Sequence, residues 1–121
     1  MEKKFINCSN HPSTKWSEFQ LNTAKTLGEV VDVPFPSVEP ELDEEGIKTL
    51  AESVISQIKE AAGASDITVH IMGEMCLTFA VVCELMAMGI PCVASTTRHI
   101  AKEMPDGTKI SQFEFVQFRR Y

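Results

Sequence analysis

Short apolar runs alternate along this chain with longer segments in which apolar residues recur at helical spacing. Each short run is bounded by Pro, Gly or polar residues, which predicts a β-strand. The predicted strands cover 4–8, 29–33, 67–72 and 91–95. The run at 67–72 is nearly continuous in apolar character, which is typical of a strand covered on both faces.

Three helices are predicted between these strands. A capping-box spacing favours a first helix that begins near Ser17 and ends at Gly28. A second helix lies between Asp43, its cap, and Gly63, because its apolar positions share one face. The third helix, 77–88, is apolar almost all round, so we expect it to be the most buried of the three.

The end of the chain has a different pattern. Asp106-Gly107 is a signal for a two-residue hairpin turn, and 109–118 alternates like a strand with one wet face. Strands joined by amphipathic helices form right-handed units that cover both faces of a sheet. We therefore predict one domain over 1–121, an open, Rossmann-like, mostly parallel α/β sheet of about five strands with helices on both faces and a C-terminal antiparallel strand or hairpin. Its ligand crevice should lie between the first and third strands.

Composition and charge narrow the possible functions. The 121 residues are 44% hydrophobic and carry a formal net charge of −6, which is globular usage and disfavours duplex nucleic acid as a partner. A short or cyclic nucleotide stays compatible, because a few directed donors can bind an anion. No export signal or membrane-length apolar run is present, so we expect a cytoplasmic protein without membrane contact.

Cysteines and methionines are assigned to packing. The cysteines lack metal-ligand spacing, so we expect small buried side chains, no metal site and no cofactor. These cysteines are Cys8, Cys76, Cys83 and Cys92. A group of methionines is likewise expected to fill the core, namely Met72, Met75, Met86 and Met88.

The first candidate for ligand chemistry is the polar run that follows the first strand. Asn7, Ser9 and Asn10 could hydrogen-bond a ligand, and His11 could exchange a proton near neutral pH. The alternative is that these polar groups only satisfy turn and cap positions, with Pro12 shaping the loop. Position at the carboxyl end of the central strand favours a binding role.

The second candidate is the turn Gly73–Thr78, which leads into the third helix. Gly73 allows close backbone approach, and free amides at a helix start attract an anion. The spacing is not that of a P-loop. Glu74 would repel phosphate, so it either accepts from a ribose hydroxyl or a base amine or is simply a helix-end carboxylate. Ligand contacts from Gly73, Glu74 and Thr78 would then join those of the first turn.

A third candidate follows the fourth strand. The hydroxyls of Ser95 and Thr96 could bind a ligand, and the Arg98 guanidinium could contact a phosphate. The alternative is that these residues are simply solvated at the end of the strand and contact no ligand.

Three further residues receive mainly structural interpretations. His70 is expected to be a satisfied core histidine within its buried strand, and Trp16 to pack over the first helix, although an aromatic so near the loop could stack on a base. Asp32 could meet a ribose hydroxyl, but no GxGxxG follows the first strand.

The chain resembles a family of small, mostly uncharacterised bacterial proteins, some of which are labelled CRISPR-associated. The shared segments run almost end to end and are Asn7–Ser13, Asp32–Pro36, Gly73–Thr78 and Phe113–Tyr121. The opening segment and overall plan also resemble the small CRISPR ring nucleases and their CARF-like relatives. Those proteins bind cyclic oligoadenylate on a Rossmann-type sheet, usually as homodimers.

The second resemblance implies a role in antiviral defence and a metal-independent cleavage. In that reaction a ribose 2′-hydroxyl attacks the adjacent phosphate, with Asn10, Ser9 and Arg98 stabilising the phosphate charge and His11 accepting the proton. Two alternatives stay open, because fold does not determine function. One is a nucleotide sensor or sponge without turnover, and the other is a small hydrolase or transferase acting on a nucleotide or sugar.

Overall fold

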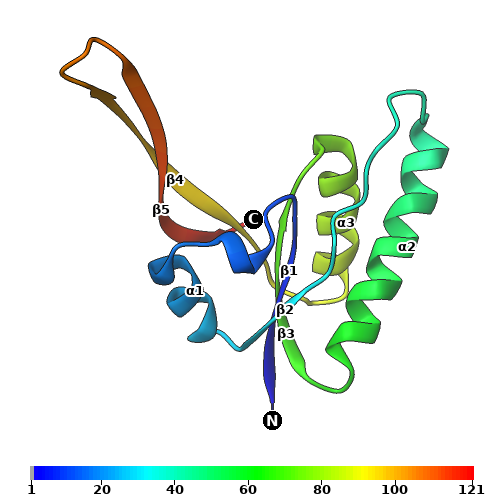
Figure 1. The fold of residues 1–121 in the computed structure, drawn as a ribbon. Coiled ribbons are helices and arrows are strands. Elements are labelled where there is room, and N and C mark those ends of the chain that lie inside the picture. Colours follow the sequence, from blue (N-terminus) through cyan, green and yellow to red (C-terminus); the bar gives the residue numbers. More distant parts are fainter. Residues whose placement is uncertain (1) are drawn as a thin grey trace.

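The computed structural model describes residues 2–121 and contains one five-stranded sheet with helices on both sides (Figure 1). Its elements are β1 (Lys3–Ser9), the 3-10 turn η1 (Ser13–Lys15), α1 (Glu18–Lys25), β2 (Glu29–Asp32), α2 (Glu44–Ala62), β3 (Asp66–Met72), α3 (Met75–Ala87), β4 (Cys92–Glu103) and β5 (Lys109–Arg120). The strand order is β2-β1-β3-β4-β5, and only the β4–β5 pair is antiparallel. The predicted fold class is confirmed, and the strand order reverses between β1 and β3 as the prediction requires.

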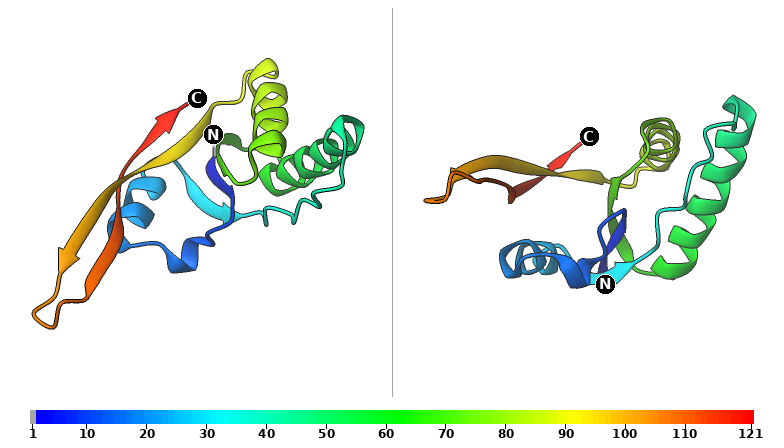
Figure 2. Two further views of the ribbon diagram at one scale, coloured as in Figure 1. Left: turned by 90° about the horizontal axis from the view of Figure 1, so that it is seen from above. Right: turned by 45° about the horizontal axis from the view of Figure 1, so that its top comes forward.

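The two faces of the sheet are covered unequally. Helices α2 and α3 cover one face, and the short α1 covers part of the other, as the views in Figure 2 agree. Side chains alternate along each strand, so Ile6 and Cys8 enter the larger core under α2 and α3. Phe5 enters a smaller cluster on the α1 face that also holds Trp16. Neighbouring Asn7 therefore lies on the α1 face.

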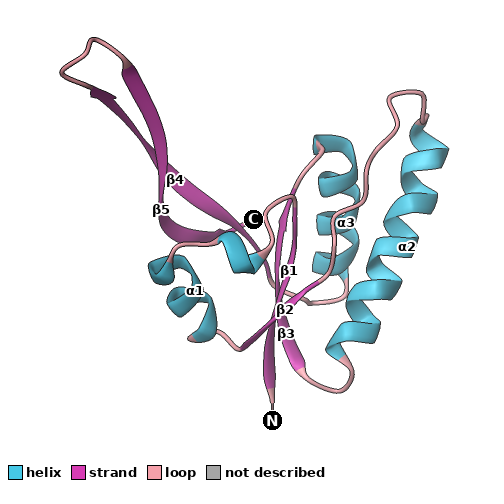
Figure 3. Cartoon of the chain, viewed as in Figure 1, coloured by secondary structure: helices cyan, strands magenta, loops and turns pink. Residues whose placement is uncertain are grey.

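The terminal hairpin is longer than predicted. β4 and β5 each contain 12 residues, and the hairpin projects beyond the rest of the sheet (Figure 3). The prediction of a two-residue turn is wrong, because Glu103 pairs with Lys109 and five residues lie in the loop between them. Within it, the Met104 amide donates to the Thr108 carbonyl at 2.7 Å and the Gly107 amide to the Met104 carbonyl at 2.9 Å. Pro105 has no amide proton to continue the ladder, which explains the wider loop.

α3 has the largest share of buried residues of the three helices, as predicted, with four of 13 against five of 19 in α2 and one of eight in α1, but it is buried along one side only. It packs against the sheet and α2 through Leu77, Val81, Val82 and Leu85, but no described element covers its outer face. The predicted core roles are therefore wrong for Cys76 and Cys83 and for the methionines at 72, 75, 86 and 88, all of which are exposed. Cys8 and Cys92 are buried as expected, and burial raises the pKa of both thiols to about 11. Within 2–121, no helix has the length and apolarity needed to cross a membrane.

Candidate functional site

Strand register builds one polar row across the α1 face of the sheet. Asn7 of β1 stands opposite Asp32 of β2 on one side and His70 of β3 on the other. The Asn7 side-chain amide donates to Asp32 Oδ1 and to the His11 carbonyl, both at 2.9 Å. Its oxygen lies 2.8 Å from His70 Nδ1. The carboxylate, amide and imidazole therefore form one hydrogen-bonded chain.

The same row holds the loop after β1 in place. Ser9 Oγ lies 2.8 Å from Asn7 Oδ1 and 3.1 Å from the His11 carbonyl, and it accepts from the His11 amide at 3.2 Å. Ser13 donates to both oxygens of Asp32, from its hydroxyl at 2.9 Å and from its amide at 3.3 Å. Both protons and both lone pairs of the Asn7 side chain are thus engaged. Asn7 therefore supports the loop from beneath and has no free group for a ligand.

These partners also determine the tautomer of His70. The Asn7 nitrogen faces the acceptors Asp32 and His11, so the Asn7 oxygen faces His70, and the proton must sit on Nδ1. His70 Nε2 is then a bare lone pair, buried and without a hydrogen-bond partner among residues 2–121. Burial, with a smaller contribution from His11, lowers the pKa of His70 to about 4. His70 is a neutral buried histidine as predicted, but only one of its two nitrogens is satisfied.

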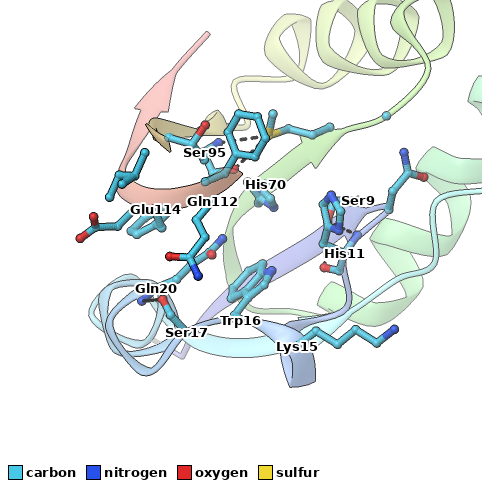
Figure 4. A pocket seen from close by; sticks show the side chains of 17 residues that line it. Ser9, His11, Lys15, Trp16, Ser17, Gln20, His70, Ser95, Gln112 and Glu114 are labelled. Atoms are coloured by element: carbon cyan, nitrogen blue, oxygen red, sulfur yellow. Dashed lines mark hydrogen bonds between the residues drawn. The ribbon is translucent and has the colours of Figure 1, made fainter. Parts of the chain in front are cut away.

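A pocket of about 1040 Å³ opens over this row, on the α1 face at the carboxyl end of the sheet. That volume lies just above the ordinary range for ligand pockets, about 300–1,000 Å³. Figure 4 shows Trp16 between Ser9 and His11 on one side and Gln20 and Gln112 on the other. The lining comes from Ser9, Asn10, His11, Lys15, Trp16, Ser17, Gln20, His70, Met72, Gly73, Ser95, Thr97, Ile100, Gln112, Phe113, Glu114 and Phe115.

Aromatic and charged groups give the pocket its character. Trp16 is half-buried and packs edge-on against His70 at a centroid distance of 5.5 Å. Phe113 reaches the pocket from β5 and is largely exposed. Among the described lining residues, Lys15 is the one Lys or Arg and Glu114 the one carboxylate. Such a balance suits a ligand with one anionic group better than one with several.

The structure brings only some of the predicted site residues to this pocket. Ser9, Asn10, His11, Gly73 and Ser95 line it. Asn7 lies beneath it, and the remaining predicted residues are absent from the lining. Thr96 donates its hydroxyl to the Gln117 carbonyl at 3.3 Å, and Arg98 stands opposite Glu114 in the hairpin ladder.

The second predicted turn has structural functions. The Glu74 carboxylate accepts from the amides of Cys76 at 3.2 Å and Leu77 at 2.8 Å, so it caps α3 and occupies the donors predicted to attract an anion. A Cβ at Gly73 would lie 2.4 Å from the Phe35 ring, so this ring is what requires glycine there. Thr78 lines a separate groove. The pocket accordingly extends from the first turn toward the hairpin, not toward α3.

Sequence reasoning missed the contribution of η1, α1 and the hairpin. Lys15, Gln20 and Phe113 line the pocket although none follows a strand that predicts a crevice. Helical periodicity and the register of a distant hairpin decide their positions, and no local motif marks them. Within the described residues, no three His, Cys, Asp or Glu side chains cluster so as to hold a metal ion.

Comparison with known proteins identifies a family and structural neighbours. The model of the family described as "Uncharacterized protein MJ1673 family" matches residues 3–119. No curated protein matches the sequence. Among solved structures, "Enterococcus italicus Csm6 bound to cyclic hexa-2'-fluoro-hexa-dAMP" is similar at a TM-score of 0.44 and 12% identity. The match covers 80% of this chain and 34% of that one, so this chain spans about a third of the length of that protein.

Proposed function

We propose that this chain, which belongs to the uncharacterized protein MJ1673 family, is a nucleotide-binding domain whose ligand lies in the pocket over Trp16. The observation that carries the proposal is a half-buried indole that lines a pocket otherwise rich in hydrogen-bonding side chains. A flat base stacked on an aromatic ring gains about 1–3 kcal/mol. The surrounding Ser, Asn and Gln side chains can meet a ribose and the edges of a base.

The charges favour a ligand with few phosphates. Lys15 precedes Trp16 directly and supplies the cation for one phosphate, with His11 also in the lining. In its sharper form, taken from the sequence resemblance, the proposal names a cyclic oligoadenylate of bacterial CRISPR defence, whose several phosphates this charge balance does not favour. The pocket volume of about 1040 Å³ has room for more than a single nucleotide.

Binding is favoured over cleavage. His11 and Asn10 both line the pocket, but Arg98, the third group assigned to a ring-nuclease reaction, lies outside it. A phosphodiester cleavage needs stabilisation of the phosphate charge, and Lys15 is the one strong cation that the described lining offers. We therefore propose a sensor or sponge first and a metal-independent nuclease as its alternative.

Tryptophan fluorescence tests the binding site directly, because Trp16 is the only tryptophan of the chain. Titration with AMP and with cyclic tri-, tetra- and hexa-adenylate should give saturable quenching with at least one of them, whereas a sugar phosphate without a base should not quench. By calorimetry, Trp16→Leu should lose binding and Asn22→Ala, an exposed α1 residue outside the pocket, should retain it. No saturable quenching with any base-containing ligand would reject the proposal. Linear product in the same samples would establish the nuclease alternative.

We also propose a homodimer formed through the outer face of α3. Its contact surface is the α3 stripe, defined as Met75, Phe79, Met86 and the adjoining Tyr121, which are 84%, 72%, 49% and 48% exposed. Met75, Phe79 and Tyr121 also line one groove of about 340 Å³. No side chain of the stripe is charged at neutral pH, so chains of net charge −6 meet there with little repulsion.

The exposed area of the α3 stripe is enough for a second copy of this chain. At about 200 Å² for a large side chain, the four residues expose roughly 500 Å² per copy. Two copies packed through the stripe would bury about 1,000 Å², the lower limit for a specific interface. Because a two-fold contact uses the same patch twice, an apolar stripe that itself lines a groove suits self-association.

A further inference from the structure

We propose that His70 selects the ligand of the pocket by accepting, at Nε2, a hydrogen bond from the exocyclic amine of a nucleobase. The inference rests on the proposed function, since it names the chemical class of nucleotide that the same pocket takes. Adenine is the base used below as the probe, because its amine can be removed or methylated without changing the rest of the ring.

The first step is that His70 is held as an acceptor. If Nε2 carried the proton instead, Nδ1 and Asn7 Oδ1 would be two acceptors at 2.8 Å. Asn7 cannot turn its amide to relieve that contact, because both of its protons are bound by Asp32 and the His11 carbonyl. The Asp32 carboxylate thus sets the direction of the whole chain and leaves the Nε2 lone pair facing away from Asn7.

The second step is that the protein offers no donor for this lone pair. His70 is 2% exposed, and its ring is surrounded by the rings of Phe5, Trp16 and Phe118 at centroid distances of 6.1, 5.5 and 5.3 Å. The hydroxyl of Ser95, from the next strand, donates to the Met72 sulfur at 3.0 Å. Within 2–121 the acceptor therefore stays unpaired, which costs free energy that a ligand donor would return.

The third step is that the acceptor stays neutral at physiological pH. A pKa of about 4 means that His70 does not become a cation near pH 7. A neutral lone pair accepts from N–H and O–H groups and gains nothing from a phosphate. The pocket thus separates two tasks, with Lys15 for an anionic group at the rim and His70 for a donor at the floor.

An amine is preferred to a ribose hydroxyl because of Trp16. The indole lies beside the His70 ring and lines the same pocket, so a group that stacks on the indole lies next to the imidazole whose Nε2 is buried and unpaired. A base offers a flat π-face to the indole, and a base with an exocyclic amine carries its donor in the ring plane. The ribose is then left for the Ser, Asn and Gln side chains around the rim (Figure 4).

Three related ligands test the selection. We expect AMP to bind at least about tenfold more tightly than purine riboside monophosphate, which lacks the amine, or N6,N6-dimethyl-AMP, which lacks its protons. His70→Phe keeps the aromatic packing and should abolish the preference by weakening AMP alone. Asn22→Ala should leave it unchanged. Equal binding of the three ligands to the wild type would overturn the inference and leave the nucleotide pocket intact, whereas binding of none would overturn the pocket as well.

A measurement without ligand tests the acceptor independently. In ¹⁵N NMR spectra near pH 7, the signals lost in His70→Phe should show a protonated Nδ1 and an unprotonated Nε2. Addition of AMP should move the Nε2 signal and leave that of Nδ1 nearly in place. A proton on Nε2 in the free protein would overturn the inference whatever the ligand is, and this reading needs no variant beyond the one used for assignment.

Discussion

Because the folded protein holds the buried His70 ring neutral, the free energy of unfolding depends on pH through this residue. The ordinary pKa of 6.5 applies to the unfolded chain, whereas burial holds the folded value at about 4. Between these values the unfolded chain binds the extra proton, so the stabilisation present above pH 6.5 is lost as the pH falls toward 4. The loss amounts to about 3 kcal/mol at most.

The test compares urea unfolding of the wild type and His70→Phe at several pH values from 7 to 4. The free energy of unfolding should fall more steeply for the wild type, because the variant lacks the group that titrates. Carboxylates contribute equally to both proteins and cancel in the difference. Parallel pH profiles would mean that the pKa of His70 is not lowered in the folded state.

Lys15 gives a prediction about charge at the pocket rim. Lys15→Ala should weaken AMP about two- to fivefold and leave adenosine unchanged, because an exposed cation contributes only modestly and only to a phosphate. The difference between the two proteins should shrink at high salt. Lys25→Ala is the matched control, since Lys25 is an exposed lysine of α1 outside the pocket. An equal loss for adenosine would instead give Lys15 a role in shaping the pocket.

At the scale of elements, a substitution of Glu74 tests whether its carboxylate caps a helix or contacts the ligand. Its carboxylate accepts from two amides at the start of α3, as Asp43 accepts from the Gly46 amide at the start of α2. Glu74→Ala should therefore cost about 1 kcal/mol of stability, comparable to Asp43→Ala. Nucleotide affinity by calorimetry should not change in either variant. A loss of affinity without a loss of stability would restore the ligand role that the sequence suggested for Glu74.

The elements that the sequence predicted well are those whose limits are set locally. Ser17 and Asp43 cap their helices and Gly63 ends α2, because capping depends on a few neighbouring residues. The length of β4 was not predictable in this way. Beyond Ser95 the strand is mostly exposed and is held by its ladder with β5. Periodicity also gave no means of knowing that the apolar outer face of α3 would lack a cover.

The same distinction separates the site residues that the sequence predicted from those that it missed. Topology places the ends of β1 and β3 beside the first residues of β4, which is why Ser9, His11 and Ser95 could be expected at one pocket. The role of His70 could not be predicted without the strand register. Its alignment with Asn7 places the hydrogen bond on Nδ1 and leaves Nε2 without a partner. Phe113 depends on the hairpin returning over the α1 face. Positions that depend on such long-range contacts cannot be predicted from any short segment of the sequence.

For the whole molecule, the pocket and the α3 groove are neighbours at the carboxyl end of β3. Met72 and Gly73 line both. Met72 is also held from the pocket side, because its sulfur accepts from the Ser95 amide and hydroxyl. A change in packing at this wall therefore reaches both surfaces, and binding at one should alter the free energy of binding at the other.

The α3 stripe accordingly gives a prediction about oligomeric state. Light scattering across micromolar concentrations should give twice the chain mass of 13.4 kDa for the wild type. Phe79→Glu should weaken the dimer at least about tenfold, because two uncompensated carboxylates would be buried in the contact. Phe19→Glu alters an exposed phenylalanine on α1, on the other face of the sheet, and should leave the dimer intact. A monomeric wild type, or a dimer that survives Phe79→Glu, would contradict the interface.

If the shared wall couples the two surfaces, AMP should shift the dimerisation constant of the wild type, and by linkage dimerisation should shift the affinity for AMP by the same factor.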